Sequence, residues 1–492
     1  MKYLFAALFC TLSLNVLFSQ ADTMRLTLNE VVAMAQGRAP DVQIARTAFT
    51  NNFWRFRSYQ ADLKPQLRLN ATLPDLDRSI DAITQNDGSL LFLNRSQMRN
   101  SVGISVEQQI GLTGGSVFLS SDLERLDLLG SAFSGADRIS YFSTPIAIGI
   151  NQPLFRFNPW RWDKQIEPLR FEESQRAYSE DMEQVAYGAA EFFFDILIAQ
   201  LNLEAAYRDK ANADTLFNIS KGRFDVGRIA ETELLQIELS AMNADAALAQ
   251  SALNLQTSTE RLRNFLGIQE AIQFRLTPPI SIPQFTIDSE KAISFARKNR
   301  SRVLAFQRRL LESERQVDEA RKEAGVNMDL FLYFGLSQTS NALDQAYVDP
   351  LDQERVRVGI NMPIADWGKT KSRIEIAESN RALTELQVNQ ERINFERDIL
   401  IKVQQFDLVR QQVALALRSY EIAQKSLDIT RKRYLIGKIL ITDLNIAIAA
   451  EASARQAYIS ALRTFWLALY DLRRLTLYDF ENDRPLILDP EG

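Results

Sequence analysis

Two long stretches of this chain carry apolar residues at the three- and four-residue spacing of an amphipathic helix. Residues 371–436 contain no glycine or proline, and most positions between the apolar ones are polar or charged. A helix of this length would reach on the order of 95 Å, since an α-helix rises about 1.5 Å per residue. A second such run follows Gly437, and the same plan occurs earlier in the chain around Gly227. We therefore expect two long antiparallel helical hairpins, at 161–266 and 371–484.

Ahead of each predicted hairpin, apolar and polar residues alternate with the two-residue period of a β-strand. The alternation runs through residues 67–73 and 146–152 before the first hairpin, and through 328–338 and 355–362 before the second. A glycine cluster at 111–115 predicts the turn of a further strand hairpin in the first region. Barrel-type strands are therefore expected within 65–152 and 327–363, with exposed polar loops at 75–100 and 127–142.

This alternation fits a membrane strand with lipid on one side and water on the other, and it equally fits a half-buried strand of a soluble sheet. Each region has too few strands for a stable sheet of its own, so we expect the strands to pair with those of other chains. That expectation favours a barrel shared between chains. Two strands per copy in a trimer would give twelve strands, whereas the further hairpin would give eighteen, six per chain times three.

Two short motifs recur at one spacing, which indicates an internal duplication. Ile148–Leu154 resembles Val358–Ile364, and Lys221–Gly227 resembles Arg431–Gly437, each pair being separated by 210 residues (359 minus 149, and 437 minus 227). Three prolines within six residues then mark an extended linker between the copies. The first repeat, the linker and the second repeat are placed at 20–275, 276–285 and 286–484.

Composition narrows the possible functions. The 492 residues include no histidine, which removes the commonest metal ligand and the base of most catalytic triads. The formal net charge is -5, so the chain offers no basic field for nucleic acid. Because no nucleophile–base pair or metal-ligand spacing is present, we predict no enzyme activity, no catalytic residue, no cofactor and no metal site.

Residues 1–19 resemble a secretory signal peptide, with a basic start, an apolar run at 4–18 and the small residue Ser19. Cleavage after Ser19 would remove Cys10, the only cysteine. Lipidation of Cys10 is the alternative, which Phe9 disfavours because such a site requires a small residue at that position. No later apolar run approaches the roughly 20 residues of a membrane helix. The mature chain is therefore expected either to be soluble outside the cytoplasm or to cross a membrane as strands.

The order of these elements and several motifs resemble the TolC family of outer membrane efflux proteins. The order is helix, strands, an Asn-x-Pro turn, a long helix, a glycine turn and a returning helix, followed by the same again. The motifs are the opening Leu26–Val32, the turns Asn151–Phe155 and Asn361–Gly368, and Arg433–Gly437 at the end of the second long helix. The resemblance covers nearly all of the mature chain.

The resemblance implies an α+β membrane protein. Its homotrimer would close one β-barrel in outer-membrane lipid, and its long antiparallel coiled-coil helices would continue the barrel as a periplasmic tunnel. The implied function is a passive exit duct of a tripartite efflux or type I secretion system in a Gram-negative bacterium, with a periplasmic adaptor (membrane fusion) protein and an inner-membrane transporter as partners. The exported substrate and the class of pump do not follow from the sequence. The competing interpretation is a structural or adhesive coiled-coil protein of the envelope.

The resemblance also assigns the adaptor contact to the ends of the two hairpins. The residues that would make this contact are Gly227 and Arg228 in the first repeat, and Gly437 and Lys438 in the second. From the residues alone, the glycines serve the turn itself.

A gate is implied at Asp443, six residues past the second tip glycine, with Glu233 as its counterpart in the first repeat. Three carboxylates facing one narrow opening would repel one another and attract cations. Asp443 equally fits a residue that begins the returning helix. Ile446 and Gln236 stand where some members carry a second acidic ring, so a doubled constriction is not expected.

Trp160, Trp162 and Trp367 follow the predicted strands closely. Tryptophans at such positions are typical of the belt at a membrane–water interface. Packing between the strand region and the helices explains them equally well.

Overall fold

The computed structural model describes residues 23–129, 139–270, 272–279, 282–436 and 438–488. The predicted signal peptide with Cys10, and the predicted tip residue Gly437, lie outside the described residues. The chain divides into two compact units. The sheet unit, as we call it, comprises Thr47–Tyr178 and Arg297–Asp398, with Leu488 as a described terminal residue. The hairpin unit comprises the described residues up to Arg46, together with Ser179–Ala296 and Ile399–Ile487.

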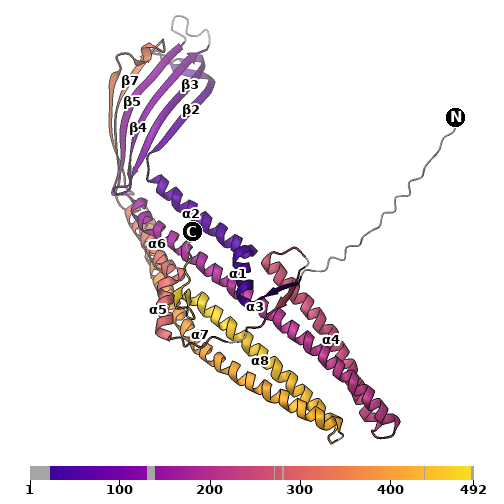
Figure 1. The fold of residues 1–492 in the computed structure, drawn as a ribbon. Coiled ribbons are helices and arrows are strands. Elements are labelled where there is room, and N and C mark those ends of the chain that lie inside the picture. The colour runs from indigo at the N-terminus through magenta and orange to yellow at the C-terminus, as the bar shows by residue number, and fades with distance from the viewer. Residues whose placement is uncertain (1–22, 130–138, 271, 280–281, 437, 489–492) are drawn as a thin grey trace, which may run out of the picture. The chain divides into compact units, whose positions relative to one another are not determined.

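The sheet unit contains one six-stranded antiparallel sheet, in the order β2-β3-β4-β5-β7-β8 (Figure 1). The first repeat supplies four of these strands and the second supplies two, so the hairpin predicted at the 111–115 glycine cluster is confirmed and belongs to the sheet. A short helical turn, η2 (Gln345–Tyr347), connects the last two strands. The strands are β2 (Gln66–Thr84), β3 (Leu90–Ile110), β4 (Gly115–Leu128), β5 (Ile139–Leu154), β7 (Asn327–Ser340) and β8 (Leu351–Asn361).

The expectation of irregular loops at 75–100 and 127–142 was wrong for most of those residues. β2 and β3 stay paired from Asp75 opposite Arg99 up to Thr84 opposite Leu90. β4 continues to Leu128 and β5 begins at Ile139, while 130–138 lie outside the described residues. The alternation signal fails here because many residues are polar on both sides of the strands, whereas the backbone ladder needs no apolar side chain.

The cross-strand register places apolar residues on one face of the sheet. Leu69 lies opposite Ile104 on β2 and β3, and the same face continues to Ile148 on β5 and Val356 on β8. All four side chains are exposed in the isolated chain. The other face carries polar residues at the intervening positions, such as Arg68 opposite Ser105 and Asn70 opposite Gly103. Strands with this alternation present an apolar surface on one side only.

Four helices of more than twenty residues contribute to the sheet unit. Within it, Arg308 on α6 donates to Glu173 on α3 at 2.6 Å and to Glu312 at 3.0 Å. Phe56 on α2 stacks on Phe171 of α3, with 4.8 Å between the ring centroids. Charged and aromatic contacts therefore join helices that lie far apart in sequence. The helices are α2 (Pro40–Asp62), α3 (Pro159–Asp225), α6 (Ser301–Glu323) and α7 (Lys369–Leu435), of which α2, α3 and α7 extend into the hairpin unit.

The three tryptophans that follow the strands have different surroundings in the sheet unit. The indole N–H of Trp162 donates to Asp318 Oδ2 at 3.0 Å, which favours the packing interpretation for this residue. Trp160 lines a small polar pocket of 190 Å³ beside Arg68 and Glu107. Trp367 is 99% exposed, which leaves it available to an interface.

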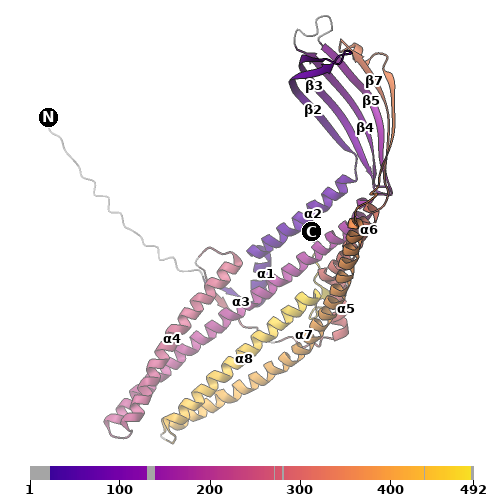
Figure 2. The same ribbon diagram turned by 180° about the vertical axis from the view of Figure 1, so that it is seen from behind.

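The hairpin unit is mainly helical. α3 and α4 form one antiparallel hairpin and α7 and α8 form another (Figure 1), and Figure 2 shows the same pairing from behind. Two short parallel strands, β1 and β6, pair beside them, and β9 and β10 form a small antiparallel pair near the C-terminus. No helix in the described part of the chain is both long and apolar enough to cross a membrane. The remaining bounds are β1 (Thr23–Leu26), α1 (Leu28–Arg38), α4 (Glu231–Leu266), β6 (Gln273–Leu276), α5 (Ser289–Asn299), α8 (Ile441–Thr476), β9 (Tyr478–Asp479) and β10 (Arg484–Pro485).

Aromatic rings and a buried ion network hold the hairpin unit together. Phe406 on α7 lies between Phe285 and Phe465, with ring centroids 5.7 and 5.2 Å away. Nearer the C-terminus, Arg473 on α8 donates to Glu183 on α3 at 3.2 Å and lies 3.8 Å from Asp479 of β9. This arginine therefore ties the segment after α8 to α3.

Candidate functional site: the ends of the two hairpins

Both hairpins close their first helix with the same backbone hydrogen bond. At the end of α3, the N–H of Arg228 donates to the carbonyl of Arg223 at 2.8 Å. At the end of α7, the N–H of Lys438 donates to the carbonyl of Arg433 at 3.0 Å. A bond of this span satisfies a carbonyl that the helix end would leave unpaired, as in a Schellman cap. The turn geometry is therefore repeated at the 210-residue spacing of the motifs.

The predicted tip residue Gly227 lies in the left-handed region, with φ +71°. A Cβ built at this position would have no atom within 4 Å, so the backbone angle and not the available space calls for glycine. Arg228 and Lys438 follow the turns with exposed side chains. Both side chains are therefore accessible to a partner protein.

The structure places Asp443 at the start of α8, where its carboxylate contacts the backbone. Oδ2 of Asp443 accepts a hydrogen bond from the N–H of Leu440 at 3.3 Å, and the side chain is otherwise exposed. This contact matches the helix-start interpretation. Glu233 occupies the same position in α4, where its N–H donates to the Ala230 carbonyl at 3.1 Å and its side chain is half-buried. The two acidic residues therefore correspond in position but not in surroundings.

A buried apolar cluster joins the ends of the two hairpins within the hairpin unit. Its core consists of Ile237 from α4 with Tyr434, Ile441 and Leu444 from the second hairpin. Partly buried residues pack against it, including Phe217 from α3. Apolar burial therefore holds the two hairpin ends to each other inside one chain.

Polar contacts around Tyr434 strengthen this junction. The Tyr434 hydroxyl lies 3.4 Å from the Ser220 hydroxyl on α3, and both side chains are buried. The guanidinium of Arg223 sits over the Tyr434 ring, 5.7 Å from its centroid, and also donates to the Leu435 carbonyl at 3.1 Å. Two side chains of the first hairpin, Ser220 and Arg223, thus meet at one tyrosine of the second.

Sequence reasoning did not single out Tyr434, Ser220 or Arg223 as contacting residues. The motifs that contain Arg223 and Tyr434 were recognised as a repeat, and their alignment places Tyr434 opposite Phe224. A tyrosine replacing a phenylalanine between two copies is a signal of a hydroxyl partner. Its identity could not follow, because Ser220 is 214 residues away in sequence.

Apolar side chains are exposed on the outer surface of both hairpin ends. Val226 in the first turn and Ile436 in the second are both more than half exposed, as is Leu440 at the start of α8. Ile446 is also exposed; it occupies the position at which some family members carry a second acidic ring. Exposed apolar residues grouped at one end of a molecule are typical of a protein interaction site.

Comparison with known sequences identifies the family. The sequence profile of the family described as "Outer membrane efflux protein" matches residues 31–268 and 292–476, which is most of the chain. The chain is 24% identical over 359 residues to the outer membrane protein TolC of Vibrio cholerae, covering 70% of this chain and 80% of that protein. It is 23% identical over 341 residues to the outer membrane efflux protein BepC of Brucella suis, covering 67% and 71%.

Comparison with solved structures agrees at the level of the fold. The outer membrane channel CmeC of Campylobacter jejuni superposes with a TM-score of 0.68 at 16% identity, covering 94% of this chain and 87% of that one. The MtrE channel of Neisseria gonorrhoeae superposes with a TM-score of 0.61 at 15% identity, covering 91% and 88%. This fold carries strands and long helical hairpins in the order described above. The chain therefore belongs to the outer membrane efflux protein family, whose members are transport channels of the Gram-negative outer membrane.

Proposed function

We propose that three copies of this chain form the exit duct of a tripartite efflux or type I secretion system, acting as a passive conduit. The observation that carries the proposal is the six-stranded sheet, which has one exposed apolar face and two free edges, β2 and β8. Free edges present unpaired backbone groups, and joining them between copies would close the sheet. Six strands in each of three copies give eighteen, the larger of the two predicted counts. The apolar face would meet outer-membrane lipid and the polar face would line the duct.

A seam on α7 supports assembly with further copies in the helical part. Leu408, Leu415, Ile422 and Ile429 recur every seven residues along α7, and Ile436 continues this spacing into the turn that follows; all five are exposed in the isolated chain. A seven-residue apolar repeat is the pattern by which one helix packs on another in a coiled coil. Such a seam is expected to be buried by another helix, and neighbouring copies supply helices in a trimer.

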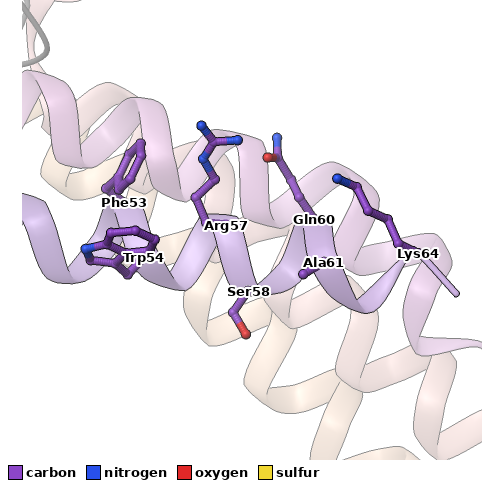
Figure 3. A pocket seen from close by; sticks show the side chains of 7 residues that line it. All are labelled: Phe53, Trp54, Arg57, Ser58, Gln60, Ala61 and Lys64. Atoms are coloured by element: carbon purple, nitrogen blue, oxygen red, sulfur yellow. The ribbon is translucent and has the colours of Figure 1, made fainter. Parts of the chain in front are cut away.

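A surface on α2 supports assembly with further copies in the sheet unit as well. Phe53, Trp54, Arg57 and Lys64 line an open pocket of 540 Å³ on this one helix (Figure 3). Trp54 is 64% exposed in the isolated chain. The guanidinium of Arg57 lies 5.3 Å from the centroid of the Phe53 ring, beside which Figure 3 shows it. Because α2 leads directly into the edge strand β2, this exposed surface would lie at a boundary between copies.

The assembly and conduction can be tested together. Detergent-extracted protein is expected to have the mass of a trimer by light scattering, and to form discrete conducting channels in planar lipid bilayers. Release of a monomer into buffer without detergent would contradict the proposal. That outcome would instead favour the coiled-coil scaffold protein, which neither the family nor the sheet supports.

The proposed partners are a periplasmic adaptor and an inner-membrane transporter, docking at the hairpin ends. Exposed Val226 and Ile436 support this assignment, because exposed apolar residues that lie together mark interaction sites, and Arg228 adds a residue type that is enriched in protein interfaces. A photo-crosslinking residue at Lys438 is expected to capture the adaptor, whereas one at Lys322, far along the chain on α6, serves as the control. Equal capture at both positions, or capture of the transporter alone, would count against the assignment.

We further propose that Asp443, with Glu233, forms an acidic constriction at the entrance. The cap contact to Leu440 uses one oxygen of Asp443 and is compatible with the other facing the opening. Asp443→Asn keeps an oxygen that can accept from the helix start but removes the charge. If the charge gates cations, this variant is expected to weaken block by divalent cations in single-channel recordings. Unchanged recordings for Asp443→Asn and Asp443→Ala would leave only the role of beginning α8.

A further inference from the structure

The β2–β3 hairpin extends beyond the other described strands of the sheet. β3 first pairs with β4 at Gln97 opposite Leu128, so among the residues that the structure describes, the strand residues of 79–95 above this level pair only within the hairpin. We call this segment the outer hairpin. Its turn is formed, since Asp87 Oδ1 accepts from the Ser89 N–H at 2.9 Å and the Gln85 N–H donates to the Ser89 carbonyl at 2.8 Å. An isolated two-stranded ribbon is marginally stable in water, so a formed ribbon this far beyond its neighbours is expected to have another partner.

The outer hairpin carries large apolar side chains that are exposed in the described part of the isolated chain. Phe92 is 65% exposed, and Ile80, Ile83, Leu90 and Leu91 are also exposed. The register places them on both sides of the ribbon: Ile83 lies opposite Leu91 on the side of the polar face, whereas Phe92 pairs with Ala82 on the other side. Exposed apolar residues gathered on a short ribbon indicate an interaction surface.

Membrane lipid does not fit as the occupant. Arg78 and its partner Ser96 interrupt the apolar face just below the outer hairpin, and Asn94 interrupts it at the start of the hairpin, so the apolar residues of the hairpin are separated from the band that would meet lipid. Hydrocarbon also cannot satisfy unpaired backbone groups. Such groups are present, because β2 has 19 residues and β8 has 11, a difference of eight. A β8 strand of a neighbouring copy that begins at the same end of the sheet would leave the edge of β2 unpaired along the outer hairpin.

A second copy of this chain does fit. The outer hairpin continues the β2 edge that we assign to contact between copies, so this inference rests on the proposed trimer. Threefold symmetry would bring three identical ribbons around one opening, at the end of the sheet farthest from the helices. We propose that the three outer hairpins pack on one another through Ile83 and Leu91, which lie on the side of the polar, duct-lining face, and form an apolar constriction at the outer mouth of the duct. A narrow apolar ring restricts water and ions by dewetting, without any charged gate.

Engineered cysteines test the contact in the full chain. The only natural cysteine is Cys10, so Cys10→Ser gives a background without thiols. In this background Leu91→Cys is expected to give a disulfide-linked dimer on mild oxidation, visible as a band of doubled mass that disappears on reduction. Leu69→Cys is the control, since Leu69 is more exposed than Leu91, at 69% against 42%, but lies on the apolar face of β2 below the outer hairpin. Absence of the band for Leu91→Cys, or equal bands for both variants, would overturn the contact.

Conductance tests the constriction itself. The double variant Ile83→Ser and Leu91→Ser is expected to raise single-channel conductance by about twofold or more, because a wetted ring carries ions that an apolar one excludes. Val356→Ser, an exposed position on the apolar face, is the control and is expected to leave conductance unchanged. Gel filtration confirms that each variant is still a trimer. A trimeric double variant with unaltered conductance would refute the constriction while leaving the proposed duct intact, whereas a chain that never forms a conducting trimer would refute both.

Discussion

The two hairpins have the same dimensions. α3 and α7 each contain 67 residues, and α4 and α8 each contain 36. The turns between them are closed by equivalent backbone bonds, from Arg228 in one copy and Lys438 in the other. Lengths and turn bonds have therefore been retained in both repeats.

The surroundings of the two returning helices differ. Twelve residues of α8 are buried within the chain, against three residues of α4. Tyr434 at the second hairpin end is buried, whereas the aligned Phe224 is 37% exposed. Asp443 contacts the start of α8, whereas α4 begins after Ala230, which makes no side-chain cap. The two repeats have therefore kept the same backbone geometry, whereas the burial of their side chains has diverged.

The largest effect should come from replacing the two aligned aromatic residues separately. Tyr434→Ala is expected to cost about 3–5 kcal/mol, the usual range for removing a fully buried aromatic side chain. Phe224→Ala should cost roughly 1 kcal/mol, since its ring is partly in water already. Urea unfolding of the detergent-solubilised protein, followed by circular dichroism, measures both. Equal losses would mean that the two hairpin ends are equivalent in solution.

Two glycine substitutions distinguish the requirement for glycine in the turn from its effect inside a helix in the first hairpin. Gly227→Ala is expected to destabilise the protein by about 1–2 kcal/mol, because an L-residue is strained at its positive φ. Gly222→Ala lies inside α3, where an added Cβ has no atom within 4 Å, and should stabilise it by roughly 0.5–1 kcal/mol. Thermal unfolding of the two variants gives shifts of opposite sign if this holds. An unchanged or higher melting temperature for Gly227→Ala would show that the turn does not require glycine.

The start of each returning helix offers a smaller test. Asp443→Ala is expected to cost about 1 kcal/mol, because the Leu440 N–H loses its acceptor. Glu233→Ala, at the aligned position in α4, should cost less than that. Comparing the denaturation midpoints of the two variants measures the difference. A larger loss for Glu233→Ala would show that the acidic residue of the first repeat has the stronger structural role.

The smallest expected effect concerns stability in acid. Burial of the Asp479 carboxyl tends to raise its pKa, but hydrogen bonds from Asn482 and the charge of Arg473 outweigh burial and hold the pKa below its ordinary value. Stability from this group is therefore present above the ordinary pKa of about 3.8 and is lost as pH falls through the lower folded value. Asp479→Asn is expected to flatten the acid side of a plot of melting temperature against pH. An unaltered acid side would exclude this contribution.

The long helices were the most predictable part of the fold. A helix was expected from 371 to 436, and α7 runs from Lys369 to Leu435. The prediction succeeds because a regular apolar repeat in a polar background allows few other structures. The strands were predicted only where one face is apolar, as at Leu67–Leu73. Higher on β2, Arg78 and its partner Ser96 interrupt the apolar face, although the strands stay paired.

The candidate site was predictable in position but not in its contacts. Repeat matching located Gly227, Arg228 and Lys438 at the hairpin ends, and it aligned Asp443 with Glu233. The association of Tyr434 with Ser220 depends on how two helices far apart in sequence pack together. No local pattern encodes that packing, because both residues also fit an ordinary helix face.

The matched hairpin lengths restrict how this protein can change in evolution. A seven-residue insertion lengthens a helix by about 10.5 Å. Made in α3 and α4 alone, it would carry Ser220 and Arg223 away from Tyr434 and Leu435, and the cluster that joins the hairpin ends would be lost. A viable change of length therefore has to occur in four helices together, which requires coordinated insertions at two sites in each repeat. The lengths of the two hairpins can thus change only together, although four separate helices in the sequence determine them.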